Sequence, residues 1–416
     1  MNHVHRILSP TAPFTAPPPL KKCSSRNSIS PARSQPPEVE LAVPVEELAS
    51  TSVIFAVAGA PGHDLLGHAE CAARVPAILE ALESHGINQN IRVLQLPDWY
   101  LASPEEIAPV HIPKYIAALE RTSENARDVA NVIVDPAPTY VTQTTYRDAL
   151  NAAGAAMSLV DHVVAASLQQ QQDKGDNAVL EVPIGFSICR PPGHHAVPTN
   201  GMGFCLLNNA AVAVKHAQQV HGLKKVAVYD FDVHHGNGTE DVFTSDPSVL
   251  FISTHQSGSY PNTGKAEFVG KDDGEGTSIN IPLPGDAGHL AALSAFDELV
   301  GPALKRFNPE MIICSAGFDA HWDDQLAGLQ FRSGTYHTLA TKIKALAHEI
   351  ESCGGRVVFL LEGGYNLRAL GESVASTFNG ILGDKVIDSI DPSLLRDEPL
   401  EKVKAVLLES RRIHGL

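Results

Sequence analysis

Four apolar runs in this chain each end in a dense cluster of polar residues, and this feature constrains the fold more than any other. The runs at 184–189, 226–229, 311–315 and 357–361 have the length and apolar character of buried strands. The clusters that follow them are, in order, Arg190 to His195, Asp230 to Gly238, Ala316 to Asp319 and Glu362 to Tyr365. Sites in open α/β sheets form at the carboxyl ends of the strands. We therefore expect all four clusters to line one crevice.

Strand-like runs alternate with segments of helical periodicity from Thr51 onward, which predicts an α/β fold with parallel strands joined by helices. Two further strands are expected at 53–58 and 249–253. The stretch from Gln169 to Gln172, followed by Asp-Lys-Gly-Asp, is predicted to be a surface loop, since nothing in it can build a core. Helices are expected at 71–85, 145–168, 208–221, 289–306, 335–352 and 367–382.

The N-terminal segment differs from the rest of the chain in composition. Residues 1–37 hold five of the 31 Lys and Arg residues and no acid, and they are rich in Ser and Pro. They lack the apolar core of a secretory signal, so the composition is typical of a plastid or mitochondrial transit peptide. A disordered tail without a targeting role is the alternative. In either case residues 1–45 are excluded from the folded domain.

The charge of the remaining chain limits its partners. Residues 38–416 keep 26 basic groups against 47 acidic ones, a net charge of −21, which argues against binding a phosphate backbone. No apolar run approaches the ~20 residues that a membrane helix requires, which favours a soluble protein. The six cysteines contain no Cys-x-x-Cys pair and are expected to be reduced thiols. We expect no nucleic-acid or membrane partner.

The cluster that begins at Asp230 has the donor atoms of a metal site. Residues two apart in an extended segment point to the same side, so Asp232 and His234 can converge on one cation, with Asp230 beside them. Asp319 can supply a third ligand and leave one position open, as in catalytic zinc sites. The alternative is a helix cap or a set of loop hydrogen bonds, but so many polar groups are costly to pack without a partner. We expect a zinc ion here.

Two adjacent histidines, His194 and His195, lie in a loop that proline and glycine residues constrain on both sides. An imidazole can take up and return a proton at neutral pH. Asp230 and Asn237 are the natural partners to fix the tautomer of each ring. The alternative is a pair of surface histidines without a catalytic role.

Tyr365 follows two glycines, which allow the backbone to turn the phenol toward the predicted crevice. Its hydroxyl could then stabilise an oxyanion that develops beside the metal. A tyrosine after a Gly-Gly turn is more often a packing residue, so this motif indicates a role only together with the others. The sequence has no Walker A loop, no nucleophile elbow, no dinucleotide fingerprint and no complete zincin helix.

Taken together, the clusters resemble the signature blocks of the zinc-dependent histone deacetylases in their order and spacing. The resemblance covers roughly residues 55–385 and implies an arginase/deacetylase-like fold with a central parallel sheet of about eight strands. It predicts a catalytic domain at 51–385 and a C-terminal helical extension, 386–416, packed on it. The matching segments are Arg190 to Ala196, Asp230 to Gly238, Ser315 to Ala320, Leu361 to Tyr365 and, in addition, Gly67 to Arg74.

The resemblance also implies a role for each residue. His195, backed by Asn237, would be the general base and acid. His194, backed by Asp230, would give electrostatic support, and Tyr365 would polarise the acetyl carbonyl. One zinc ion per chain would be bound by three residues, namely Asp232, His234 and Asp319.

A second cation and a substrate channel follow from the same resemblance. Phe204, next to Gly203, and Tyr260 match the aromatic walls of an acetyl-lysine channel, and Leu326 lies near its mouth. A potassium ion near the zinc is also expected. Its ligands would be Asp230, Asp232, His234, Ser253 and the backbone of Thr254.

Two positions place the chain within the family. Asn237 stands where class I enzymes have Asp, which indicates class II, and Tyr365 is present where the weakly active class IIa branch has His. We therefore expect an active enzyme. With its transit-like N-terminus, the pattern is most similar to the plastid-type plant class II deacetylases. A chloroplast location is expected, with the mitochondrion or the cytosol and nucleus as alternatives.

One departure concerns the substrate. An acidic residue grips the substrate backbone in many relatives, and here Pro138 stands at that position, with Asp135 nearby. Recognition of a peptide backbone is therefore expected to differ. Acetylated lysine side chains and small N-acetylated amines, such as N-acetylserotonin-like arylalkylamines, are both candidate substrates.

Two other functions compete with a deacetylase on these residues. A dinuclear-manganese ureohydrolase on the same fold would need further Asp and His ligands that bridge two metals, and Tyr365 and the His194-His195 pair argue against it. A catalytically silent scaffold that binds acetylated amines is disfavoured by the complete catalytic set.

Overall fold

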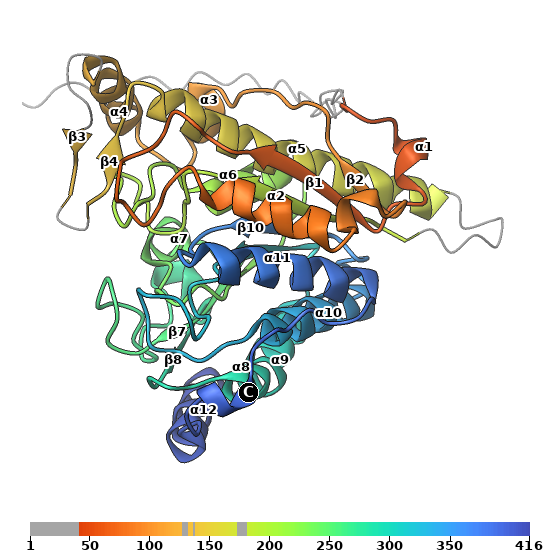
Figure 1. Cartoon of the computed structure of the whole chain (residues 1–416), viewed down its shortest axis with the longest axis vertical. Helices are drawn as coiled ribbons and strands as arrows, with labels where there is room; N and C mark the ends of the chain where they lie inside the picture. The colour runs from red at the N-terminus through yellow and green to blue at the C-terminus, as the bar shows by residue number, and fades with distance from the viewer. Residues whose placement is uncertain (1–40, 127–131, 136–137, 173–180) are drawn as a thin grey trace, which may run out of the picture. The chain divides into compact units, whose positions relative to one another are not determined.

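The computed structural model describes residues 41–126, 132–135, 138–172 and 181–416 (Figure 1). The described residues, from 41 onward, form one compact unit. The predicted transit segment, 1–45, lies almost wholly outside the described residues, and only its last five residues are described, ending at the start of helix α1 (Val45–Leu48).

Eight parallel strands form the central sheet, in the order β2-β1-β5-β10-β9-β6-β7-β8, which confirms the predicted fold class. The four strands that precede the polar clusters, β5, β10, β9 and β6, are direct neighbours at its centre. Their carboxyl ends therefore lie side by side. The strands are β1 (Val53–Ala58), β2 (Val93–Gln95), β5 (Ile184–Cys189), β6 (Val226–Asp230), β7 (Val249–Gln256), β8 (Ser278–Leu283), β9 (Met311–Ala316) and β10 (Val357–Leu361).

Helices cover the sheet on both faces (Figure 1). Helices α5 and α6 pack together against the central strands, and α2, α10 and α11 form a second group that contacts β1 through α11. A small antiparallel pair, β3 (Val132–Ile133) and β4 (Tyr140–Val141), stands apart from the sheet. The further helices are α2 (Arg74–Ser84), α3 (Pro104–Ile107), α4 (Pro113–Asn125), α5 (Thr145–Gln172), α6 (Asn209–Gln219), α7 (Asn237–Phe243), α8 (His289–Ala295), α9 (Gly301–Phe307), α10 (Ser333–Glu349), α11 (Leu367–Leu382) and α12 (Leu400–His414).

All six predicted strands are present, but two strands of the sheet were not predicted. Both are at the edges, β2 and β8. Strand β2 has only three residues, and β8 contains Pro282, which pairs with His255 of β7. Proline cannot donate to a strand ladder and is confined to edge strands, so its presence hid this strand in the sequence.

The predicted loop is wrong over Gln169 to Gln172, because α5 continues to Gln172, and its remaining part, 173–176, lies outside the described residues. Glutamine is a good helix former, and it extends a helix whose earlier turns are already held by packing. The predicted helix at 289–306 is present but is interrupted by a π-helical turn, η3 (Phe296–Val300). Pro302, which lacks an N–H donor, is the second residue of α9, the helix that follows this turn.

Helix α5 also corrects the expectation about apolar length. Among the described residues it is the one helix long and apolar enough to cross a membrane, but 89% of its apolar window is buried inside the protein. It packs against β1, β5 and β10, as a core helix does.

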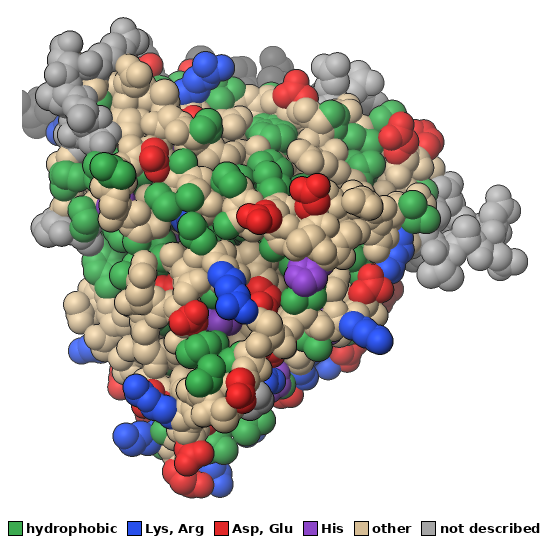
Figure 2. Space-filling view, in the orientation of Figure 1, with side chains coloured by type: hydrophobic (Ala, Val, Ile, Leu, Met, Phe, Trp, Pro, Cys, Tyr) green, Lys and Arg blue, Asp and Glu red, His purple; other side chains and the backbone are tan. Residues whose placement is uncertain are grey.

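The last helix, α12, packs against β8 and α8. On the face shown in Figure 2, basic and acidic side chains are interspersed around the lower end of the molecule, where Figure 1 places α12. On this face, the charges of the two signs are mixed around that end of the molecule.

A substitution in the aromatic core beside β5 should lower the free energy of unfolding strongly. Phe186 on β5 is fully buried and lies 5.9 Å from the ring of Phe359 and 5.0 Å from that of Phe378. Phe186→Ala should lower the free energy of unfolding by about 3–5 kcal/mol, because it leaves a cavity among aromatic rings. Ile91→Ala, at a side chain that is 93% exposed, is the control and should change it by no more than about 0.5 kcal/mol. Equal effects in denaturant unfolding would contradict this account of the core.

Candidate functional site

Three of the four predicted clusters line a cavity of about 220 Å³ at the carboxyl edge of the sheet, and the fourth reaches it through Asp319, which contacts the lining residue His234. His195 follows β5, His234 follows β6 and Tyr365 follows β10, and all three reach this cavity. The four residues predicted for the substrate channel complete its lining, namely Gly203, Phe204, Tyr260 and Leu326. The Tyr260 ring stands perpendicular to that of His195 at 5.0 Å, and the Phe204 ring is perpendicular to that of Tyr365 at 5.6 Å.

Asp232, His234 and Asp319 form one group at the base of this region. The Nδ1 atom of His234 lies 3.2 Å from Asp232 Oδ1 and 3.1 Å from Asp319 Oδ2, and the three ligand atoms lie within 4.8 Å of one another. Both carboxylates are fully buried. The backbone is pressed so closely against them that a Cβ atom on Gly363 would lie 2.2 Å from Asp319 Oδ2. The two carboxylates are thus held at fixed positions.

The electrostatics of this group fit a divalent cation. Burial, and then the charge of Asp232, raise the pKa of Asp319 to about 7. Burial disfavours the charged imidazole, but hydrogen bonds with Asp232 and Asp319 still raise the pKa of His234 to about 10. Two buried carboxylates at this separation repel each other unless a positive charge lies between them. Two carboxylates and one imidazole are a zinc donor set.

The two adjacent histidines have different environments. The Nδ1 atom of His194 lies 3.0 Å from Asp230 Oδ2, and that of His195 lies 2.7 Å from Asn237 Oδ1. Burial lowers the pKa of His194, but the charges of Asp232 and Asp230 outweigh it and hold the pKa well above its usual value. Burial, and then the neighbouring His194 and His234, hold the pKa of His195 well below its usual value. One ring is therefore charged and the other neutral at pH 7.

Tyr365 is held by Asp324, which the motif analysis did not single out, and by Arg74, the last residue of the matching segment Gly67 to Arg74. Its backbone N–H and that of Asn366 donate to Asp324 Oδ2, at 2.6 and 3.0 Å. The guanidinium of Arg74 donates to the carbonyl oxygens of Glu362 and Gly364 and lies 5.1 Å from the Tyr365 ring. Asp324 belongs to no motif, and only its position five residues after Asp319 places it near the site.

Glu362 supports the other side of the same turn. Its Oε2 atom accepts from the backbone N–H groups of Gly193 and His194, at 2.6 and 3.0 Å. Burial raises the pKa of Glu362 to about 7. The carboxylate thereby links the histidine loop after β5 to the tyrosine loop after β10.

The residues predicted to bind potassium lie on neighbouring strands. Asp230 on β6 pairs in register with Ser253 on β7, and both are fully buried. The Ser253 hydroxyl lies 2.9 Å from Nδ1 of His255, and Thr254 follows it on the same strand.

The segment around Pro138 reaches the channel wall through a chain of hydrogen bonds. Thr139 donates its hydroxyl to Asp135, and the same oxygen accepts from the backbone N–H of Phe204 at 2.9 Å. The Pro138 carbonyl accepts from Nε2 of His68 at 2.9 Å. Burial, and then the charge of Asp135, raise the pKa of Tyr260. Asp135 thus places an acidic group near the channel, although Pro138 has none.

Comparisons with known proteins agree with this geometry. Residues 68–381 match the histone deacetylase domain. The chain is 48% identical over 378 residues to histone deacetylase 14, chloroplastic, of Arabidopsis thaliana, covering 89% of this chain and 87% of that protein. It is 45% identical over 398 residues to histone deacetylase 10, chloroplastic, of Oryza sativa subsp. japonica, covering 94% and 87%.

More distant relatives differ in what their names state. Polyamine deacetylase HDAC10 of Mus musculus is 33% identical over 348 residues, covering 81% of this chain and 48% of that protein. Among solved structures, the crystal structure of the HDA15 HD domain matches with a TM-score of 0.74 and 31% identity, covering 88% of this chain and 95% of that one. Sequence and structure lead to the same conclusion: the chain belongs to the histone deacetylase family, with plastid-type plant members among its relatives.

Proposed function

We propose that this chain is a zinc-dependent amidohydrolase that removes acetyl groups from amines and releases acetate. The observation that carries the proposal is the buried Asp232, His234 and Asp319 group beside His195 and Tyr365 at one cavity. Family membership supports deacetylase chemistry, and the donor set supports zinc, one ion at this site. When bound, zinc would polarise the acetyl carbonyl and make a water molecule more acidic.

In this proposal His195 moves the proton. Its Nδ1–H donates to Asn237 Oδ1, which leaves the lone pair of Nε2 free on a ring that lines the cavity. The low pKa keeps the ring neutral, so it can accept a proton from the attacking water and then give it to the departing amine. His194 stays charged against Asp230 and supplies a fixed positive field.

Tyr365 stabilises the developing oxyanion. Burial, and then the charge of Asp319, raise the pKa of its phenol, which therefore remains protonated and able to donate. Asp324 and Arg74 hold the loop that carries it, so the hydroxyl is positioned before the substrate binds.

We extend the proposal to a potassium ion beside Asp230, Asp232 and His234. The pairing of Asp230 with Ser253 supports it, because the register places a carboxylate and a hydroxyl next to each other without solvent. The backbone carbonyl of Thr254 would complete an oxygen-rich set. Such a cation would balance the excess of buried carboxylates under the zinc site.

Two substrate classes fit the site, acetylated lysine side chains and small N-acetylated amines. The aromatic walls suit an unbranched or planar chain that carries an acetamide at its end. Asp135 near Tyr260 favours a substrate with a cationic or amide N–H group at the mouth. The polyamine deacetylases among the relatives support the small-amine class.

A screen of acetate release tests this function. Acetylated lysine peptides, N-acetylserotonin and acetylated polyamines are incubated with the purified zinc-loaded enzyme. We expect acetate from at least one class and no urea-type product from guanidino compounds. If no acetylated amine releases acetate while zinc is bound, the proposed function is wrong.

The domain division and the location are also part of the proposal. The match at 68–381 supports a catalytic domain at 51–385, and the packing of α12 on β8 supports an extension at 386–416. The chloroplastic relatives and the acid-free first 37 residues support a transit peptide and a plastid location. Residues 1–45 fused to a fluorescent protein should direct it to plastids. Diffuse cytosolic and nuclear signal would contradict this.

The floor of the channel predicts a further effect. Gly203 has φ +55°, and a Cβ atom there would lie 2.4 Å from Cδ2 of His195 and 2.8 Å from the Tyr260 ring. Gly203→Ala should therefore displace His195 and lower kcat/KM by on the order of 10²-fold. Gly86→Ala is the control, since Gly86 has a similar φ of +67° and no atom near its Cβ position. It should lose about 1 kcal/mol of stability and keep its activity. Equal activity in the two variants would contradict the close contact.

A further inference from the structure

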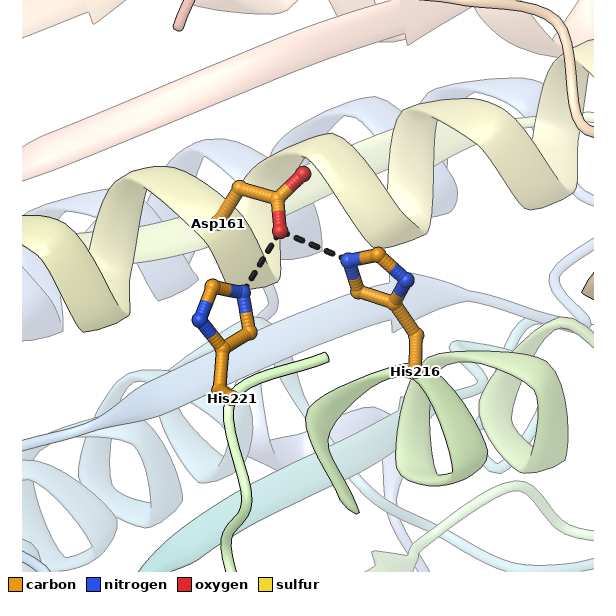
Figure 3. Close-up of side chains that lie close together, drawn as sticks. All are labelled: Asp161, His216 and His221. Carbon is orange, nitrogen blue, oxygen red and sulfur yellow. Dashed lines mark hydrogen bonds and ion pairs between the residues drawn. The ribbon is translucent and has the colours of Figure 1, made fainter. Parts of the chain in front are cut away.

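A second cluster of metal-ligating side chains lies away from the catalytic cavity. Asp161 on α5 faces His216, in the last turn of α6, and His221, just beyond the end of that helix (Figure 3). Helix α6 starts beside the catalytic loops, where Asn209 donates to the carbonyl of Pro191. His216 lies seven residues further on, about 10 Å along the helix axis. The cluster is therefore separate from the catalytic group.

The three side chains converge on one point. The Nε2 atoms of both imidazoles lie 2.6 Å from the same oxygen, Oδ1 of Asp161, and all three ligand atoms lie within 4.8 Å of one another. Asp161 is 2% exposed and His216 8%, while the His221 side chain is 12% exposed. Among the described residues, the other two such groups belong to the catalytic region. This third group is buried but can be reached from the side of His221.

The orientation of the Asp161 carboxylate supports a cation. The Tyr100 hydroxyl donates to the second oxygen, Oδ2, at 3.4 Å, which leaves Oδ1 toward the imidazoles. In a purely hydrogen-bonded group, each imidazole could contact a different oxygen of the Asp161 carboxylate. Here both imidazoles contact the same oxygen, Oδ1. Ligating carboxylates in metal sites are held by outer hydrogen bonds of this kind.

We propose that Asp161, His216 and His221 form a second zinc site, which ties the end of α6 to α5. Two imidazole nitrogens and one carboxylate oxygen are a zinc donor set, whereas Mg²⁺ and Ca²⁺ prefer oxygen ligands throughout. A water molecule on the side of His221 would complete the tetrahedron. None of the three residues is among the described residues that line the catalytic cavity, so we assign the site a structural role. It is independent of the proposed catalytic function.

Zinc stoichiometry tests the proposal on the full-length chain. The protein is stripped with a chelator, reloaded with Zn²⁺ alone, freed of excess metal and measured by elemental analysis. The wild type should bind about two zinc ions. Asp161→Asn and His221→Ala should each bind about one, and Asp161→Asn/Asp319→Ala should bind about none. His85→Ala, at an exposed histidine outside the cluster, is the control and should keep both.

A stability measurement covers variants that fold poorly. In the Asp319→Ala background, which lacks the catalytic zinc, added Zn²⁺ should raise the melting temperature, and His221→Ala should abolish this shift. One outcome would overturn the proposal. If the wild type binds a single zinc ion that Asp319→Ala removes, and His221→Ala changes neither the zinc content nor the Zn²⁺-dependent rise in melting temperature, the cluster is a hydrogen-bonded group without metal. If instead Asp319→Ala leaves the zinc content unchanged and His221→Ala lowers it, the second site stands and the catalytic site assignment fails.

Discussion

Tyr365→Phe should lower kcat by on the order of 10²-fold or more and leave KM nearly unchanged. The phenol is buried and protonated, and its loop is fixed by Asp324 and Arg74. Its hydroxyl would act on the oxyanion, which exists only after water has attacked, so its loss should affect the transition state rather than substrate binding. Steady-state kinetics on the preferred acetylated amine give both constants.

The control for this substitution is Tyr146→Phe. It also removes a buried phenol hydroxyl, but that hydroxyl has no hydrogen-bond partner among the residues that the structure describes, and Tyr146 lies on α5 outside the catalytic cavity. It should leave kcat unchanged. Near-normal kcat in Tyr365→Phe with zinc still bound would show that another group donates to the carbonyl.

His195→Ala should have a still larger effect than Tyr365→Phe, on the order of 10⁴-fold in kcat, because one ring serves both proton transfers. The neutral ring, with Nδ1 fixed by Asn237, is the group that can accept a proton at pH 7. His194→Ala should cost less, since the charged ring paired with Asp230 already holds its proton. The loss of His194 should lower kcat because it removes a positive charge near the cavity and leaves the buried Asp230 carboxylate without its partner.

Zinc content should persist in both histidine variants, because neither removes a ligand of the proposed site. The pH profile separates their roles: the acidic limb of kcat/KM reports protonation of the base and should disappear in the residual activity of His195→Ala. His194→Ala should keep this limb. If His194→Ala proved the more damaging and lost the limb, the two roles would have to be exchanged.

The site was more predictable from the sequence than the edges of the fold. Asp232, His234 and Asp319 could be grouped because polar residues directly after buried strands are costly unless they bind something, and the strand order β5-β10-β9-β6 brings those strand ends together. Strand β8 was not predicted because Pro282 lies within it and proline is rare inside strands. The last turn of α5 was missed although glutamine is a good helix former, because the polar run was interpreted as a loop that could build no core.

Two groups of residues could not be predicted from the sequence, because their contacts depend on how distant segments pack together. Asp324 fixes Tyr365 by accepting from its N–H, an interaction that depends on how two loops meet in space. The cluster of Asp161, His216 and His221 unites residues 55 and 60 positions apart. Neither has a local sequence pattern, so only the packing of α5 against α6 could show the second group.

The most direct test of the central claim measures zinc content and acetate release on the same preparations of the wild type and Asp319→Ala. The account predicts that Asp319→Ala loses about one zinc ion per chain together with acetate release, because the remaining Asp232 and His234 cannot hold the ion alone. An Asp319→Ala protein that keeps both its zinc and its activity, or a wild type that carries two tightly bound manganese ions at this site, would contradict it.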